Sequence, residues 1–65
     1  MVSYDPLWKL LIDKKMNKLD LCKEVGISTA TLAKMGKDEY IALKIVDKIC
    51  GSLKCNIEDV VSITH

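Results

Sequence analysis

Three cysteines and one histidine are the residues of this chain that could bind a metal or form a disulfide. Cys22, Cys50 and Cys55 contain no C-x-x-C pair, and together with His65 their spacing matches no common zinc module. Their odd number also argues against a disulfide framework. We therefore predict no metal and no cofactor, and we expect the cysteines to act as small apolar residues of the core.

The residue types needed for catalysis are equally sparse. The only histidine is the last residue, there is no glycine-rich phosphate loop, and no nucleophile has a base close to it in the sequence. The acidic residues are scattered, as is usual on solvated helix faces. We predict that the protein is not an enzyme.

Length and composition favour one small helical domain. The chain of 65 residues is expected to form a single domain over 1–65. Apolar residues make up 49% of the sequence and recur every three to four positions, which predicts an all-α fold. No apolar run approaches the ~18 residues of a membrane span. Because the N-terminus also lacks the features of a secretory signal, we expect a cytoplasmic protein without membrane contact.

The apolar periodicity divides the chain into five expected helices. They span about 6–15, 18–25, 29–36, 42–53 and a short segment after Asn56. The residues expected to cap their free amides are Asp5, Asn17, Ser28 and Asn56. The β-prone end, residues 61–65, is expected to be a tail or a strand that seeks a partner.

Two aromatic residues, Tyr4 and Trp8, lie just before and within the first expected helix. Trp8 and Ile12 share the apolar face of this helix, so we expect Trp8 in the core. An interface role for Trp8 and Tyr4 is the alternative.

Lysine residues are concentrated in the first part of the chain. Residues 9–37 hold seven lysines against three acids, a net charge of +4, whereas residues 38–65 hold three lysines against five acids, a net charge of −2. One end of the domain is therefore expected to be basic. This distribution suits a protein that docks one face on a polyanion, although the total charge is only +1.

The segment from Lys18 to Lys37 has the spacing of a helix-turn-helix. Cys22 is a small residue four positions before Gly26, which allows two helices to cross closely and the turn to adopt a positive φ. The apolar positions that would hold the two helices together are Leu21, Val25, Ile27, Leu32 and Met35. The motif, at about 18–36, predicts that the helix over 29–36 enters the major groove of DNA.

The stretch MNKLDLCKEVGISTATLAKMGK resembles helix two, turn and recognition helix of the lambda-repressor-like (Cro/Xre) helix-turn-helix proteins. The resemblance runs from about Pro6 to Val61 and implies a compact five-helix domain. It also implies a sequence-specific transcriptional regulator that binds double-stranded DNA, usually as a homodimer. The positions that read bases in the family are here Thr29, Ala30, Ala33 and Lys34. The positions near the phosphate backbone are Lys18, Ser28, Thr31 and Lys37.

The expected recognition surface departs from the family pattern in its polar residues. Lys18 replaces the polar residue, often Gln, that begins helix two, and the surface is poor in Gln, Asn and Arg. We therefore expect modest or partly indirect reading of the DNA sequence. The low net charge leaves a second interpretation open, a protein–protein interaction module that keeps the fold as a scaffold. Tyr40, Val61 and Ile63 are the candidates for a dimer contact.

Overall fold

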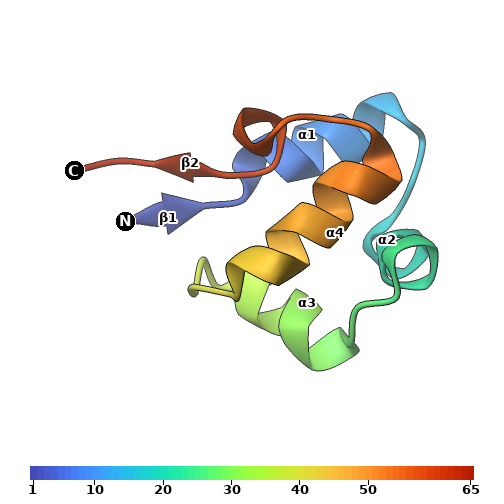
Figure 1. Cartoon of the computed structure of the whole chain (residues 1–65), viewed down its shortest axis with the longest axis horizontal. Helices are drawn as coiled ribbons and strands as arrows, with labels where there is room; N and C mark the ends of the chain where they lie inside the picture. Colours follow the sequence, from blue (N-terminus) through green and yellow to red (C-terminus); the bar gives the residue numbers. More distant parts are fainter.

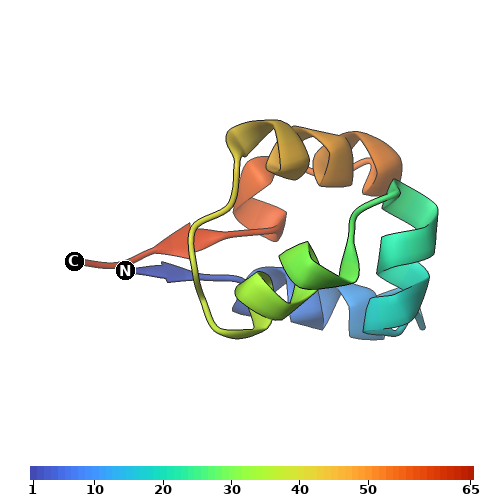
Figure 2. The same cartoon turned by 90° about the horizontal axis from the view of Figure 1, so that it is seen from below.

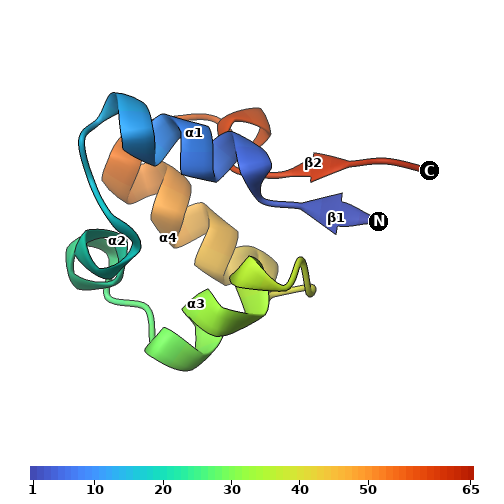
Figure 3. The ribbon, with the colours of Figure 1, turned by 180° about the vertical axis from the view of Figure 1, so that it is seen from behind.

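The computed structural model describes residues 1–65 as four α-helices and a small sheet (Figure 1). In chain order the elements are β1 (Val2–Ser3), α1 (Asp5–Asp13), α2 (Lys18–Val25), α3 (Thr29–Gly36), α4 (Leu43–Leu53), the 3-10 helix η1 (Ile57–Asp59) and β2 (Ser62–Ile63). Helix α4 crosses the middle of the molecule, between α1 and α3, and the two strands project from one end (Figures 1 and 3).

Eleven buried apolar residues form one core, to which every α-helix contributes. Those with the largest fully buried side chains are Tyr4, Leu7, Leu21, Met35, Ile49 and Val60. Each such side chain contributes about 1.5–3 kcal/mol of burial free energy. Helix α2 packs on both α3 and α4, so the helix-turn-helix is seated directly on the core.

Local capping fixes the bounds of α2. The Asn17 side chain accepts a hydrogen bond from the Asp20 amide at 2.7 Å, and the Asp20 carboxylate accepts one from the Asn17 amide at 3.0 Å. Such a capping box satisfies two amides that the helix leaves unpaired. At the other end Gly26 has φ 81° and donates its amide to the Cys22 carbonyl at 2.8 Å. The predicted bounds of the second and third helices are confirmed.

The prediction of an all-α fold with five helices is wrong at the C-terminal end. The expected fifth helix is the single 3-10 turn η1, at the start of which the Asn56 amide donates to the Asp59 carboxylate at 3.0 Å and the Asp59 amide donates to the Asn56 carbonyl at 3.0 Å. The β-prone end forms β2, which pairs antiparallel with β1 so that Val2 lies opposite Ile63. The strand therefore finds its partner within the same chain, at a separation that no local pattern can reveal.

The first helix is shorter than expected, and Ile12 lies outside the core. Helix α1 ends at Asp13, and its N-cap is Tyr4, whose carbonyl accepts the Trp8 amide at 3.1 Å. Asp5 is thus the first helical residue and not the cap. Ile12 is 73% exposed, and Trp8 is half-buried at the edge of the core, because the neighbouring helices cover only the Leu7–Leu11 side of α1.

Tyr4 joins the N-terminal strand to the loop between α3 and α4. Its side chain is 1% exposed, and its hydroxyl donates a hydrogen bond to the Glu39 carbonyl at 2.7 Å. The Tyr4 amide also donates to the Asp38 carboxylate at 3.4 Å. Burial raises the pKa of the Tyr4 phenol above its ordinary value of 10.0. Tyr4 is therefore a core residue and not an interface residue.

Candidate nucleic-acid interface

Helix α3 has one face in the core and one face in solvent. Met35 is buried, and Leu32 packs against the core from the same side of the helix. The four residues predicted to read bases are all exposed: Thr29, Ala30, Ala33 and Lys34. Their spacing places them together on the outward side of α3. Seen from below, no other helix passes in front of α3 (Figure 2).

The hydroxyls of Ser28 and Thr31 hold the start of α3 in place. The Ser28 Oγ accepts the Thr31 amide at 3.1 Å and donates its own proton to the Thr31 Oγ1 at 3.0 Å. Ser28 is exposed and Thr31 is half-buried. Two of the four residues predicted to lie near the DNA backbone, Ser28 and Thr31, thus also form the cap of α3. The remaining free amides of the first turn, with the positive end of the helix dipole, favour a phosphate at this point.

Lys18, the predicted phosphate contact at the start of α2, has a partner that sequence reasoning missed. Its ammonium lies 4.4 Å from the centre of the Trp8 ring on α1. A cation over the face of an indole ring is held by the ring quadrupole, which restrains the lysine side chain. The two residues are ten positions apart on different helices, so no helical spacing could have paired them.

Lys37 lies at the opposite end of α3 from Ser28. It is the C-cap of the helix, is exposed, and donates its amide to the Lys34 carbonyl at 3.1 Å. Two acidic residues, Asp38 and Glu39, follow it directly, which lowers the local positive potential. The candidate residues of 28–37 are therefore gathered on one helix and its two ends, whereas Lys18 is supplied by the neighbouring helix α2.

The outward face of α3 can make a small set of contacts with base edges. The Lys34 ammonium can donate to guanine O6 or N7, and the Thr29 methyl and Ala30 can pack on a thymine methyl. No side chain on this face offers the two-pronged hydrogen bonding of Arg, Asn or Gln. The chemistry thus favours single hydrogen bonds and methyl contacts over bidentate reading.

No group of three or more His, Cys, Asp and Glu side chains is arranged to hold a metal ion. None of the helices combines the length and hydropathy that crossing a membrane requires.

Comparison with known proteins identifies the family. The model of the Cro/C1-type HTH DNA-binding domain matches residues 6–64. The crystal structure of the transcriptional regulator VanUg is similar, with a TM-score of 0.91 and 46% identity over 94% of this chain and 81% of that chain. No curated protein matches the sequence. These matches are to a DNA-binding domain and a regulator rather than to enzymes, and they confirm the resemblance inferred from the sequence. The chain belongs to the Cro/C1-type helix-turn-helix DNA-binding domain family.

Proposed function

We propose that this protein is a transcriptional regulator that binds a specific DNA sequence by placing α3 in the major groove. The observation that carries the proposal is the uncovered outer face of α3, formed by Thr29, Ala30, Ala33 and Lys34. The opposite face of the same helix is held by buried Met35, so α3 can be presented as a rigid element. The likeness to a solved transcriptional regulator supports the same function.

Base reading is tested by replacing the one charged residue on the outer face of α3. A binding sequence is first selected from random duplex DNA, and binding of a labelled duplex is followed by fluorescence anisotropy. Lys34→Ala should weaken the selected duplex by about 1–3 kcal/mol and mixed-sequence DNA by less. Lys9→Ala is the matched control, because this exposed lysine is on α1, across the core from α3 (Figure 1). Equal affinities for the two variants would remove Lys34 from the base-reading set.

Phosphate contact by Lys18 predicts a different signature. Lys18→Ala should weaken selected and mixed sequences alike and reduce the slope of log affinity against log salt by about 1. Lys37→Ala serves as a comparison at the other end of α3. An unchanged salt slope in the Lys18 variant would show that this lysine only packs on Trp8.

The alternative, a protein-interaction module, is distinguished by NMR. Mixed-sequence duplex DNA is titrated into labelled protein at low and at moderate salt. The regulator predicts shifts concentrated at residues 28–37 that weaken as salt is added. If no shifts appear even at low salt, the interaction module is favoured. The net charge of +1 and the absence of arginine support this alternative.

We further propose that the protein binds DNA as a homodimer through the end that carries the sheet. Four large apolar residues are exposed there: Tyr40 (76%), Leu43 (71%), Ile57 (48%) and Ile63 (61%). They border one groove whose lining is entirely apolar and includes half-buried Val61. A second copy would cover this surface and pair two recognition helices for two half-sites.

The dimer is tested by sedimentation velocity with matched isoleucine variants. Ile63→Lys should shift the protein toward monomer. Ile12→Lys, at a similarly exposed isoleucine on α1 outside this surface, should not. A monomer for the unaltered protein, both free and bound to DNA, would contradict the proposal.

A further inference from the structure

The end of α4 brings two cysteines against each other. Cys50 lies in the last turn of α4, and Cys55 follows Lys54, which has the left-handed φ of 54°. The amides of Lys54 and Cys55 both point back to the Cys50 carbonyl, and the Cys55 N to Cys50 O distance is 3.0 Å. This return of the chain is a known way to end a helix, and it places residues five apart side by side.

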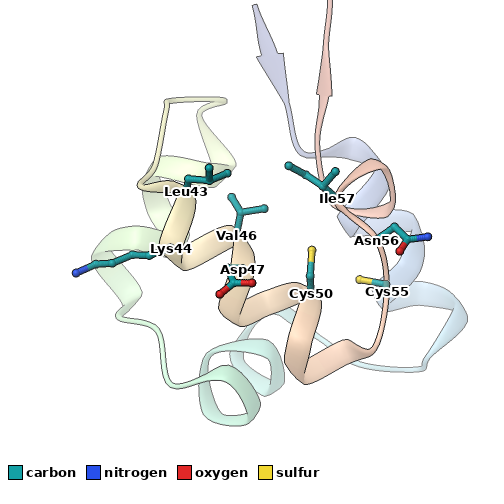
Figure 4. A pocket seen from close by; sticks show the side chains of 8 residues that line it. All are labelled: Leu43, Lys44, Val46, Asp47, Cys50, Cys55, Asn56 and Ile57. Atoms are coloured by element: carbon teal, nitrogen blue, oxygen red, sulfur yellow. The ribbon is translucent and has the colours of Figure 1, made fainter.

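The two thiols line the same open hollow. Figure 4 shows the sulfur of Cys55, on the segment after α4, directed toward the side of the hollow where the Cys50 sulfur lies. Both residues are half-buried, and the hollow of about 580 Å³ is bounded on its other sides by residues that include Leu43, Val46 and Ile57. The two sulfurs are therefore neighbours in one hollow that is open to a small molecule.

The third cysteine does not belong to this arrangement. Cys22 is half-buried on α2, packs against the core, and does not line the hollow. A chemistry that requires two neighbouring thiols should therefore separate Cys50 and Cys55 from Cys22.

We propose that Cys50 and Cys55 form a redox-active dithiol that closes to an intramolecular disulfide when it meets a low-molecular-weight disulfide such as oxidised glutathione. One cysteine thiolate attacks a glutathione sulfur, which forms a mixed disulfide and releases one glutathione thiolate. The second cysteine then attacks the protein sulfur, which forms the Cys50–Cys55 bond and releases the other glutathione. Two protein thiols are oxidised, and one glutathione disulfide is reduced to two thiols.

The surroundings of Cys55 bear on the order of these two steps. Burial, with the adjacent Cys50, raises the pKa of the Cys55 thiol and so disfavours the thiolate that would make the first attack. We therefore assign Cys55 to the second step, the resolution of the mixed disulfide. The Cys55 amide already donates a hydrogen bond to the Cys50 carbonyl, so the fold holds the two residues close together before any bond forms.

The alternative is a purely structural role, in which the two cysteines only make the apolar contact that often accompanies this kind of helix end. The two interpretations differ in what oxidised glutathione does to the intact protein. The purified protein is equilibrated in buffers with set ratios of oxidised to reduced glutathione, quenched with acid, alkylated and weighed by mass spectrometry. No variant is needed for this first measurement.

The dithiol predicts that the number of alkylated cysteines falls from the three of the reduced protein to one, with Cys50 and Cys55 linked in the peptide map. In Cys22→Ser the number should fall to zero without a change in the linked pair. In Cys55→Ser, a glutathione adduct should accumulate on Cys50, because the resolving thiol is gone. Circular dichroism confirms that each variant keeps its helices.

Three results would overturn the proposal. They are three alkylated cysteines at every ratio, a disulfide that includes Cys22, and a disulfide between two copies of the chain. None of these measurements involves DNA, so their outcome does not depend on whether the protein binds DNA.

Discussion

The helix-turn-helix and the sheet end of this molecule are held together in different ways. The hydrogen bonds that cap both ends of α2 and the start of α3 join residues three or four positions apart, such as Asn17 with Asp20. The sheet end depends on bonds between distant parts of the chain. The Met1 amino group donates to the Thr64 carbonyl at 2.6 Å, and Tyr4 reaches Glu39 across 35 positions.

The exposed surfaces of the two regions also differ in the kind of side chain that they present. The outer face of α3 has small and polar side chains, which suit a wet, charged partner. The sheet end exposes large apolar side chains such as Tyr40 and Ile63, which suit burial against protein. The locally determined region is therefore the one proposed to contact DNA, and the region built from long-range contacts is the one proposed to pair with a second copy.

The largest effect is expected where both regions share the core. Leu21 is fully buried on α2, whereas Leu19 on the same helix is 59% exposed. Leu21→Ala should lower the free energy of unfolding by about 2–5 kcal/mol, because it leaves a cavity. Leu19→Ala should change it by less than about 0.5 kcal/mol. Urea unfolding of both variants tests this, and equal effects would show that burial of Leu21 in the core adds nothing to stability.

A smaller effect is expected from the turn of the helix-turn-helix. Gly26 has φ 81°, so Gly26→Ala should lower the unfolding free energy by about 1–2 kcal/mol although a Cβ would meet no neighbouring atom. Gly51 in α4 also has open space around it, and there an alanine should raise stability by about 0.5–1 kcal/mol. Thermal unfolding compares the two. If both substitutions changed the unfolding free energy in the same direction, the positive φ of Gly26 would not be the reason that glycine is needed in this turn.

The smallest effect is expected at the sheet end, from loss of one hydrogen bond. Tyr4→Phe removes the bond to the Glu39 carbonyl and should lower the unfolding free energy by about 0.5–1.5 kcal/mol. Hydrogen exchange should accelerate at the Thr64 amide, which donates to the Met1 carbonyl, more than at the amides of α2. Uniform acceleration across both regions would show that the sheet end does not open separately.

Because the pKa of Tyr4 is raised, the difference in stability between the unaltered protein and Tyr4→Phe should depend on pH. The folded protein keeps the Tyr4 phenol protonated above its ordinary pKa of 10.0. The stability that the protonated phenol gives to the fold is therefore fully present below about pH 10. It is lost as the pH rises through the folded pKa. The unaltered protein should therefore lose stability above pH 10 more steeply than Tyr4→Phe. Parallel curves in urea unfolding against pH would contradict the assignment.

The contrast between local and long-range contacts also explains what the sequence could predict. Asn17, Gly26 and Ser28 act on residues within four positions, so the bounds of α2 and α3 follow from the sequence alone. The pairing of Val2 with Ile63 depends on how the ends of the chain return to each other, and the β-prone end alone could not supply it. Within the candidate site, helical spacing placed the outer face of α3 correctly.

Other features of the site required the folded arrangement. Ile12 has the spacing of a core residue but lies beyond the reach of any covering element, and it is 73% exposed. The contact of Lys18 with Trp8 depends on how α1 and α2 meet, which no single-helix pattern describes. Sequence periodicity identifies which face of a helix is apolar, whereas the elements packed against the helix determine how much of that face is buried.

The contact between Lys18 and Trp8 makes the protein its own optical probe. Trp8 is the only tryptophan of the chain, so the indole emission of the whole molecule comes from a ring that has one ammonium over its face. A phosphate that draws Lys18 away would change the charge next to the indole and with it the wavelength of emission. Binding of DNA could then be followed without any label, and the signal should disappear in Lys18→Ala even where binding remains.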